Sequence, residues 1–352
     1  MKQLRFGILG AADIARKNWK SIFHSGNSVV TAVASRDVAR SRRFIKELQA
    51  KACFVPAPVA LGSYGELLGS PDVDAVYIPL PTGLRKEWVL RAAAAGKHVI
   101  CEKPCGVSLA DAREMTDACA RNRVQFMDGV MFMHHPRMDR ICEALDDGKS
   151  LGRIKRITSS FSFRMAENVY DTNVRLNRRL EPAGCLGDLG WYCIRFGLWA
   201  MKWKLPLAVT GHILSERGSS RNSSPVPTDF SAELIYDDDT SMNFYCSFMA
   251  GYQNWVHVSG EKGQLRVADF VHPVNDLEST FEVNGREVRV RSGGGKRVQS
   301  GAVAQQTNMI RNFAKQVLSG KLNKEWPESA LKTQRVLDAC LESARRGAPV
   351  KL

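Results

Sequence analysis

The sequence lacks the features that mark secreted, membrane-spanning and zinc-ribbon proteins. Its nine cysteines are an odd number and include no C-x-x-C pair, which argues against a disulfide framework and against a zinc ribbon. No stretch approaches about 18 uninterrupted apolar residues, so we expect no membrane span. Residues 1–17 enter a strand pattern directly, without the apolar segment that a signal peptide needs. We therefore expect a cytoplasmic protein without a metal site.

Basic residues outnumber acidic residues, but they are not clustered in one part of the sequence. The 352 residues include 50 Lys+Arg and 36 Asp+Glu, which gives a net charge of +14. The excess is spread evenly, with 19 Lys+Arg against 12 Asp+Glu in residues 1–130 and 31 against 24 in the remainder. A nucleic-acid-binding protein usually concentrates its charge on one face or arm. We therefore expect no nucleic-acid partner, although the charge also suits attraction to phosphorylated small molecules.

The length predicts two domains, since about 150 residues form a typical domain. In the first part of the chain, short apolar runs alternate with amphipathic helical periods, from residues 5–9 and 11–24 through to residues 125–129. This alternation predicts an N-terminal Rossmann domain in residues 1–125, a doubly wound parallel sheet with helices on both faces. The expected fold class is α/β.

The pattern changes in residues 126–352. Alternating apolar and polar residues flank turns such as Asn284-Gly285, which is a strong hairpin signal. These runs predict an α+β domain with an open, mainly antiparallel sheet, interrupted by one helix near residues 190–201. Residues 214–228 and 292–301 are expected to be polar loops. The helical periods near the C-terminus are expected to form helices that can pack back on the Rossmann domain.

A turn rich in small residues joins the first predicted strand to the first predicted helix. It reads GILGAADIA over residues 7–15, which gives G-x-A-x-x-A where the dinucleotide-binding fingerprint has G-x-G-x-x-G/A. Small residues let the backbone approach a pyrophosphate, and the free N–H groups of a helix N-terminus attract it. The alternative is a tight turn without a ligand. The residues expected to bind the dinucleotide are Gly10, Ala11, Ala12, Asp13 and Ile14.

The end of the second predicted strand indicates which dinucleotide binds. An NAD site places an acidic side chain here to bind the ribose hydroxyls, whereas an arginine suits the 2′-phosphate of NADP. Arg36 lies 26 positions after Gly10, close to the expected spacing, and the Ser35 hydroxyl can donate to the same phosphate. Asp37 comes one position late and is expected to cap the next helix. NADP(H) is therefore the expected cofactor.

A lysine follows the predicted strand 98–101, in the sequence Cys101-Glu102-Lys103-Pro104. Residues just past the carboxyl end of a parallel strand face the crevice in which ligands bind. A lysine there supplies a fixed positive charge beside a nicotinamide ring or a substrate hydroxyl. The alternative for this residue, taken by itself, is an ordinary surface lysine.

Several segments together resemble the Gfo/Idh/MocA oxidoreductases. They are the N-terminal turn, Glu102-Lys103-Pro104, residues 76–82 (VYIPLPT) and residues 184–192 (GCLGDLGWY). The resemblance covers essentially the whole chain and is closest to the branch with dihydrodiol dehydrogenases and NADP-dependent D-xylose dehydrogenases. It implies a homodimer formed through the C-terminal sheet. Two positions depart from the family pattern: Ala12 replaces the second fingerprint glycine, and Arg85 stands where many relatives have histidine.

The resemblance implies roles for the matching residues. Lys103 corresponds to the catalytic lysine, and Tyr192 to the tyrosine that acts as acid or base in aldose and dihydrodiol dehydrogenases. Asp188 corresponds to an acidic residue one helical turn earlier, on the same helix face. Arg175 aligns with a substrate-domain loop, where it holds either substrate or a carboxylate of its own chain. The implied substrate-binding residues are Lys103, Arg175, Asp188 and Tyr192, and the implied cofactor contacts include Pro81, Thr82, Glu102 and Lys103.

The expected function is hydride transfer between NADP(H) and the hydroxyl or carbonyl carbon of a sugar, polyol or cyclic diol. A phenol of pKa about 10 needs a nearby cation to act as a base near neutrality, and Lys103 can supply it. The alternatives are a keto-sugar reductase with the same site and an NADP(H)-binding sensor without turnover. Large residues at alternating positions in 240–248 and 254–259 predict an apolar sheet face that a second copy covers.

Overall fold

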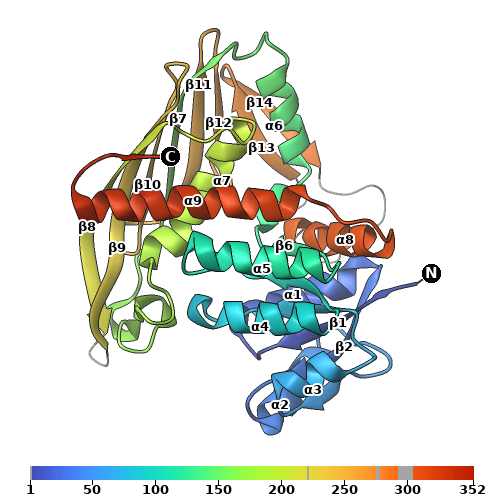
Figure 1. Cartoon of the computed structure of the whole chain (residues 1–352). Helices are drawn as coiled ribbons and strands as arrows, with labels where there is room; N and C mark the ends of the chain where they lie inside the picture. The colour runs from blue at the N-terminus through green and yellow to red at the C-terminus, as the bar shows by residue number, and fades with distance from the viewer. Residues whose placement is uncertain (1, 220–221, 275–277, 292–303) are drawn as a thin grey trace. The chain divides into compact units, whose positions relative to one another are not determined.

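A computed structural model describes residues 2–219, 222–274, 278–291 and 304–352, and its chain divides into two units (Figure 1). Each unit is built around one sheet. The first unit comprises the described residues of Met1–Gly106, Ala110–His135 and Gly293–Ala330. The second comprises those of Val107–Leu109, Pro136–Ser292 and Leu331–Leu352.

The first unit contains a parallel six-stranded sheet in the order β3-β2-β1-β4-β5-β6, as predicted. Its strands are β1 (Leu4–Leu9), β2 (Ser28–Ala34), β3 (Val59–Leu61), β4 (Ala75–Ile78), β5 (His98–Cys101) and β6 (Phe126–Asp128). The helices between them are α1 (Asp13–Ser25), α2 (Val38–Gln49), α3 (Tyr64–Gly69), α4 (Thr82–Ala94) and α5 (Leu109–Arg121), followed by a short 3₁₀ turn, η1 (Met131–His134).

Helices cover both faces of this sheet. The ring of Phe6 in β1 lies 6.0 Å from the ring of Phe313 in α8 (Ala304–Leu318), whereas a Cβ at Gly7 would meet the Leu67 side chain of α3. Because successive strand residues point to opposite faces, α8 and α3 lie on opposite sides of β1. Phe6 is fully buried. A segment from the far end of the chain therefore completes the core of the first unit.

The second unit contains a nine-stranded sheet in the order β14-β13-β12-β11-β7-β10-β9-β8-β15. Among the strand pairs of the described residues, β10–β7 alone is parallel, so the sheet is mainly antiparallel, as predicted. Its strands are β7 (Ile154–Ser162), β8 (Ala208–Ser219), β9 (Asn222–Ile235), β10 (Ser241–Ser247), β11 (Gln253–Gly260), β12 (Gln264–Val267), β13 (Glu278–Val283), β14 (Arg286–Arg291) and β15 (Val350–Lys351).

Helices pack on one face of the second sheet. The remaining elements are α6 (Arg137–Asp146), η2 (Glu167–Val169), η3 (Val174–Leu176), the π turn η4 (Leu186–Gly190), α7 (Trp191–Ala200) and α9 (Glu325–Arg346). A Cβ at Gly190 would meet Phe244 of β10, and one at Gly211 of β8 would meet the Cys340 carbonyl of α9. Phe244, Ala232 and Gly211 are paired across three strands and so point to the same face. That face is the core of the unit.

The opposite face of this sheet carries a different set of side chains. Its members Asn243, Tyr245, Trp255 and His257 are half-buried. The large apolar side chains of the same strands, such as Met242 and Phe244, instead lie buried on the helix-covered face. The apolar alternation in residues 240–248 thus belongs to the core, and the outer face is polar with interspersed aromatic rings.

The sequence was misleading for one polar segment. Residues 214–228 were expected to form a loop, but most of them continue β8 and β9 as a long antiparallel hairpin. The pairing of β8 with β9 shifts register at several points, including between Ile213 and Ser215 and between Arg217 and Ser219. These shifts let the hairpin accommodate its polar and proline residues. Backbone pairing with a neighbouring strand therefore outweighs the low strand propensity of these residues. The other expected loop, residues 292–301, lies outside the described residues.

The predicted Asn284-Gly285 hairpin is confirmed. These two residues join β13 to β14 with φ angles of 53° and 76°, the left-handed values that a tight two-residue hairpin turn requires. None of the described helices combines the length and apolar character needed to cross a bilayer.

Candidate functional site

In the turn between β1 and α1, backbone atoms rather than side chains face the position of a ligand. Gly10 has φ +116°, and a Cβ there would lie 3.1 Å from the Cδ2 atom of Leu80. Ala12 is the N-cap of α1 in an extended conformation (φ −90°, ψ 158°), without a capping side-chain hydrogen bond. Any residue can adopt that conformation, which explains why alanine is tolerated in place of the second fingerprint glycine.

This turn fits the pyrophosphate of a dinucleotide. The helix N-terminus leaves N–H groups at Asp13 and Ile14 without a side-chain cap, and such groups attract anions. Ala11 and Ala12 are small, and both Asp13 and Ile14 are exposed. The predicted cofactor-binding residues of the turn therefore lie together, in a shape that a phosphate can approach.

The end of β2 places the two predicted phosphate ligands differently. Ser35 is buried, and its hydroxyl lies 2.6 Å from the Asp37 carbonyl and 2.9 Å from the Ser41 hydroxyl. Arg36 is exposed. Asp37 caps α2 by accepting a hydrogen bond from the Ala39 N–H at 2.8 Å, which confirms its expected role. The Ser35 hydroxyl thus stabilises the turn, whereas the exposed Arg36 side chain is accessible to a ligand.

A second arginine, which sequence analysis missed, lies beside the same turn. Arg40 donates from its Nη2 atom to the Ala11 carbonyl at 3.1 Å. Burial raises the pKa of the Tyr64 phenol, and the positive charges of Arg36 and Arg40 oppose that rise. The two arginines and Tyr64 therefore form one cationic group next to the dinucleotide turn. Arg36 lies before the N-cap of α2 and Arg40 in its first turn, so no helical spacing in the sequence pairs them.

In the loop after β5, Lys103 lies next to the buried carboxylate of Glu102. The Lys103–Pro104 peptide bond is cis, and the Lys103 N–H donates to the Glu102 Oε2 atom at 3.3 Å. Glu102 is 8% exposed and accepts a hydrogen bond from the Tyr77 hydroxyl at 2.5 Å. Burial raises the pKa of the Glu102 carboxyl, whereas the Tyr77 hydrogen bond and the charges of Arg85 and Lys103 lower it.

Arg85 is a structural residue of this loop. It is 5% exposed and donates to the Leu80 carbonyl at 2.6 Å, to the Thr82 Oγ1 atom at 3.0 Å and to the Pro104 carbonyl. Pro81 and Thr82 begin α4 directly after β4. Arg85 therefore ties the predicted cofactor contacts Pro81 and Thr82 to the lysine loop.

In the second unit, Asp188 lies in the π turn that precedes α7, and Arg175 lies in the turn before it. The Arg175 Nε atom donates to the Asp188 Oδ2 atom at 2.6 Å, so Arg175 pairs with a carboxylate of its own chain. The negative charge of Asp188 raises the pKa of the Arg175 guanidinium, and Tyr192 acts in the same direction. The Tyr192 ring lies 5.5 Å from that of Phe161, edge to face, and the residue is 6% exposed. Arg175, Asp188 and Tyr192 therefore form one group.

Two glycines let the chain pack closely near Arg175, Asp188 and Tyr192. Gly184 has φ +49°, and a Cβ there would lie 2.1 Å from the Pro227 carbonyl oxygen. A Cβ at Gly190 would lie 2.8 Å from the Leu186 Cδ1 atom. The π turn is thus packed closely against the sheet, which fixes the start of α7. π turns occur frequently at functional sites.

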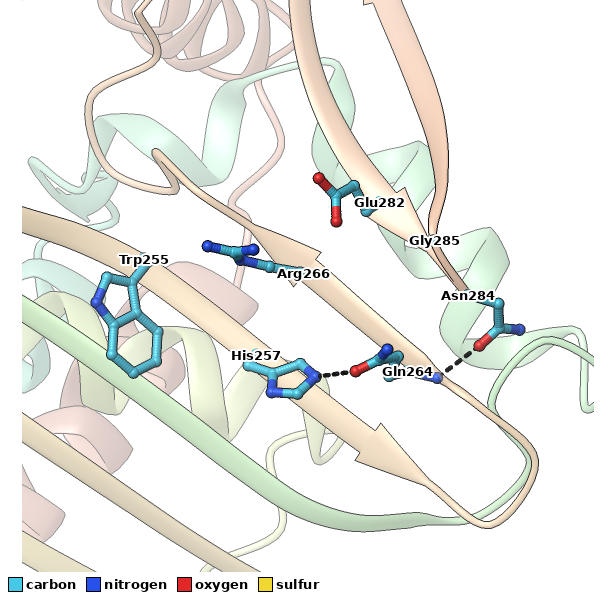
Figure 2. A pocket seen from close by; sticks show the side chains of 7 residues that line it. All are labelled: Trp255, His257, Gln264, Arg266, Glu282, Asn284 and Gly285. Atoms are coloured by element: carbon cyan, nitrogen blue, oxygen red, sulfur yellow. Dashed lines mark hydrogen bonds between the residues drawn. The ribbon is translucent and has the colours of Figure 1, made fainter.

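A separate pocket lies on the outer face of the nine-stranded sheet (Figure 2). It has a volume of about 360 Å³. None of the predicted catalytic residues lines it. Its lining residues are Trp255, His257, Gln264, Arg266, Glu282, Asn284 and Gly285.

The adjacent histidines are packing residues. His135 is 2% exposed, and the His134 ring lies 6.2 Å from the Trp326 ring and within 3.2 Å of the Asn312 side chain. Within residues 2–219, 222–274, 278–291 and 304–352, no group of three His, Cys, Asp or Glu side chains is arranged to hold a metal ion.

Two family models match most of the chain. Residues 4–130 match an oxidoreductase family with an NAD-binding Rossmann fold, and residues 138–266 match the GFO/IDH/MocA C-terminal domain. A D-xylose 1-dehydrogenase (NADP(+)) of Haloferax volcanii is 30% identical over 99% of this chain and 100% of its own. The chain belongs to the GFO/IDH/MocA oxidoreductases. The predicted family, fold and enzyme class are thereby confirmed.

Other GFO/IDH/MocA proteins are similar over nearly the full length. The trans-1,2-dihydrobenzene-1,2-diol dehydrogenase of Mus musculus is 28% identical over 99% of this chain and 97% of its own. A crystal structure of a 3-ketoreductase from Actinomadura kijaniata with NADP and TDP-benzene superposes with a TM-score of 0.82 at 28% identity, covering 99% of this chain and 98% of that one. The relatives that resemble this member of the family therefore include both dehydrogenases and a reductase.

Proposed function

We propose that this GFO/IDH/MocA protein is an NADP(H)-dependent oxidoreductase that acts on a hydroxyl or carbonyl carbon of a sugar, polyol or cyclic diol. The observation that carries the proposal is the pair Arg36 and Arg40 beside the uncapped N-terminus of α1. The similar D-xylose dehydrogenase uses NADP+, and the similar 3-ketoreductase was solved with NADP. Residues 1–125 hold the cofactor in this proposal, and residues 126–352 hold the substrate.

The cofactor is held by two kinds of contact. The N–H groups at Asp13 and Ile14, together with the small residues Gly10 to Ala12, receive the pyrophosphate. Arg36 binds the 2′-phosphate, and Arg40 lies close enough to contribute a second charge. Pro81, Thr82, Glu102 and Lys103, at the ends of β4 and β5, line the nicotinamide side.

The substrate is held and deprotonated by side chains. Bound NADP+ supplies a hydride acceptor, and NADPH a hydride donor. In the oxidative direction, the Tyr192 phenolate accepts the hydroxyl proton while the Lys103 ammonium polarises the hydroxyl oxygen. Arg175 and Asp188 form a neutral pair, which suits hydroxyl groups better than a charged substrate.

The same residues support the reverse reaction. Tyr192 then donates its proton to the carbonyl oxygen as the hydride arrives, and the product is an alcohol. A keto-sugar reductase is the second candidate because a 3-ketoreductase is similar over 98% of its length.

We also propose that the protein is a cytoplasmic homodimer that buries the outer face of the nine-stranded sheet. Half-buried Tyr245 and Trp255 lie on this face, and Arg266 stands directly opposite Glu282 on the next strand. Aromatic rings with alternating charges suit a two-fold interface in which each copy meets itself. Nine free cysteines favour a reducing compartment. Trp255→Glu should yield a monomeric mass in light scattering, and a monomeric wild type would contradict the proposal.

A spectrophotometric screen at 340 nm tests the activity. NADP+ is offered with pentoses, hexoses, inositols and cyclic diols, and NADPH with the matching keto compounds. Turnover of at least one class, with loss of that turnover in Tyr192→Phe, supports the proposal. Tight NADPH binding without turnover of any class would instead favour a sensor that binds NADP(H).

A further inference from the structure

Two buried polar side chains, Tyr77 and Glu102, are hydrogen-bonded next to the lysine loop of the first unit. Tyr77, in β4, is completely buried and donates to the Glu102 Oε1 atom at 2.5 Å. Asn18, in α1, is 1% exposed, and its side chain opposes the rise in the pKa of the Tyr77 phenol that burial causes. Burying the Tyr77 hydroxyl and the Glu102 carboxylate is costly unless they satisfy each other. The Tyr77 hydrogen bond therefore links β4 to the lysine loop.

The packing around Glu102 leaves its carboxylate little freedom. A Cβ at Gly129 would lie 3.1 Å from the Glu102 Oε1 atom and 3.2 Å from its Oε2 atom. The Glu102 N–H donates to the Ile78 carbonyl at 3.2 Å, which anchors the residue to β4. The second carboxylate oxygen accepts the Lys103 N–H at 3.3 Å. The carboxylate is thus in direct contact with the backbone at Lys103.

We propose that Tyr77 is a positioning residue for Lys103: its hydroxyl fixes the Glu102 carboxylate, which accepts the Lys103 N–H and faces the Lys103 ammonium charge. The functional meaning of this inference rests on the proposed role of Lys103. The contacts themselves lie within one unit and do not depend on the substrate. Within the run VYI of β4, Tyr77 resembles an ordinary core residue, and only its hydroxyl has this role.

The charges around Glu102 make the linkage sensitive to pH. Burial, and then the negative charge of Glu102, raise the pKa of the Tyr77 phenol, so Tyr77 keeps its proton and remains a donor. Arg85 of α4 and Lys103 are the cations that face Glu102. Two further titratable groups lie here, Cys101 of β5 and Asp128 of β6, and burial raises the pKa of the Cys101 thiol to about 12. Glu102 and Asp128 are the carboxyl groups here, and Glu102 is the one that accepts a hydrogen bond from Lys103.

Tyr77→Phe tests the inference because it removes only the hydroxyl. A hydrogen bond to a charged acceptor stabilises the carboxylate, so its loss should raise the pKa of Glu102 by about one to two units. Isotope-labelled reductive methylation places an NMR probe on Lys103 that keeps its charge, and Lys103→Met identifies the signal. In the full-length wild type, this signal should show an acid-side inflection from Glu102. In Tyr77→Phe, the inflection should move to higher pH by the same one to two units.

Two further variants keep the result unambiguous. Glu102→Gln retains the shape of the side chain and should abolish the inflection, even if Tyr77→Phe folds poorly. Tyr236→Phe is the matched control, because Tyr236 is 2% exposed and its hydroxyl has no hydrogen-bond partner among the described residues. In Tyr236→Phe, the inflection of the Lys103 signal should stay at the wild-type pH. An inflection that persists in Glu102→Gln, or that is unmoved in a folded Tyr77→Phe protein, would overturn the inference. Full activity of Lys103→Met would overturn the proposed function alone.

Discussion

The two sheets of the molecule accommodate polar groups in different ways. Helices cover both faces of the parallel sheet, so its predicted cofactor-binding residues lie just beyond the strand ends, at Gly10, Arg36, Thr82 and Lys103. Among the described residues, helices cover one face of the nine-stranded sheet, and the predicted substrate-binding residues Asp188 and Tyr192 lie on the π turn and α7, packed on that face. The first unit offers mainly backbone N–H groups and cations, whereas the second offers side-chain chemistry.

We expect this difference to separate cofactor binding, in the first unit, from proton transfer by Tyr192, in the second. Backbone contacts survive most side-chain substitutions, but an acid–base side chain has no substitute. Variants of the second unit should therefore change turnover while sparing cofactor affinity, and variants near Arg36 should do the reverse.

The largest effect is expected for Tyr192→Phe. The change removes one hydroxyl and little volume, so folding and NADPH affinity should survive, whereas kcat should fall by about 10²–10⁴-fold because the proton has no acceptor. Lys103→Met should lose at least as much. If the two residues act as a unit, the double variant should be scarcely worse than the worse single variant. Stopped-flow kinetics with a fluorescence titration of NADPH measures both properties, and a near-normal kcat in Tyr192→Phe would refute its assigned role.

The next largest effect concerns the stability of the chain before the π turn. Gly184→Ala combines a left-handed backbone with a collision against the Pro227 carbonyl, so we expect a loss of about 3 kcal/mol or more. Gly26→Ala is the matched control in the first unit, because Gly26 has φ +79° and nothing within 4 Å of a Cβ. It should cost only about 1 kcal/mol, from the backbone alone. Urea unfolding compares the two, and equal losses would mean that the Pro227 contact relaxes freely.

A smaller effect is expected for Arg36→Ala. A charge-assisted contact to phosphate contributes about 1.5–3 kcal/mol, so NADPH should bind roughly ten- to more than a hundredfold more weakly, with NADH nearly unchanged. Arg40→Ala should act in the same direction. The control is Arg43→Ala, an exposed arginine in the same helix. Equal losses for NADPH and NADH in Arg36→Ala would mean that Arg36 only shapes the turn.

The smallest effect concerns an ion pair of the first sheet. Burial acts to raise the pKa of Asp74, but hydrogen bonds from Arg5 outweigh it and the pKa is lowered from 3.8. The carboxylate therefore contributes stability above about pH 4, and this contribution is lost as the pH falls through the folded-state pKa. Asp74→Asn should cost about 1 kcal/mol at neutral pH and progressively less in acid. Asp72→Asn, which changes the more exposed partner of Arg5, should leave the pH dependence of the melting temperature nearly unchanged.

Hydrophobic periodicity was sufficient to predict both sheets, but not every strand. The apolar runs of the parallel sheet are short and continuous, so their positions are readable from sequence. The strands within residues 214–228 could not be read from the sequence, because they are held by backbone pairing and their side chains show no alternating pattern. Two short elements, β3 and α3, were also missed, since three and six residues carry little periodicity.

The candidate site was predictable only in part. Lys103 and Tyr192 follow from the family resemblance, and their catalytic roles stay predictions. Arg40 and Tyr77 were missed for different reasons. Arg40 is one of several basic residues of α2, and only the fold brings it to the Ala11 carbonyl. Tyr77 lies in an apolar run, and its partner Glu102 is 25 residues away in sequence. Sequence patterns show residue types, whereas pairing across strands needs the fold.

The π turn at Leu186–Gly190 acts as a spacer of one residue. A π turn holds one residue more than the α-helical turn it replaces. Deleting that residue would restore regular helical hydrogen bonding and leave the packing of α7 on the sheet in place. It would also rotate the preceding chain by about 100° around the helix axis, since each residue of an α-helix turns by that angle. The chain that carries Arg175 and Asp188 would turn relative to Tyr192, whose place on α7 would not change. The length of this segment, and not its composition, therefore aligns the Asp188 carboxylate with the Tyr192 phenol.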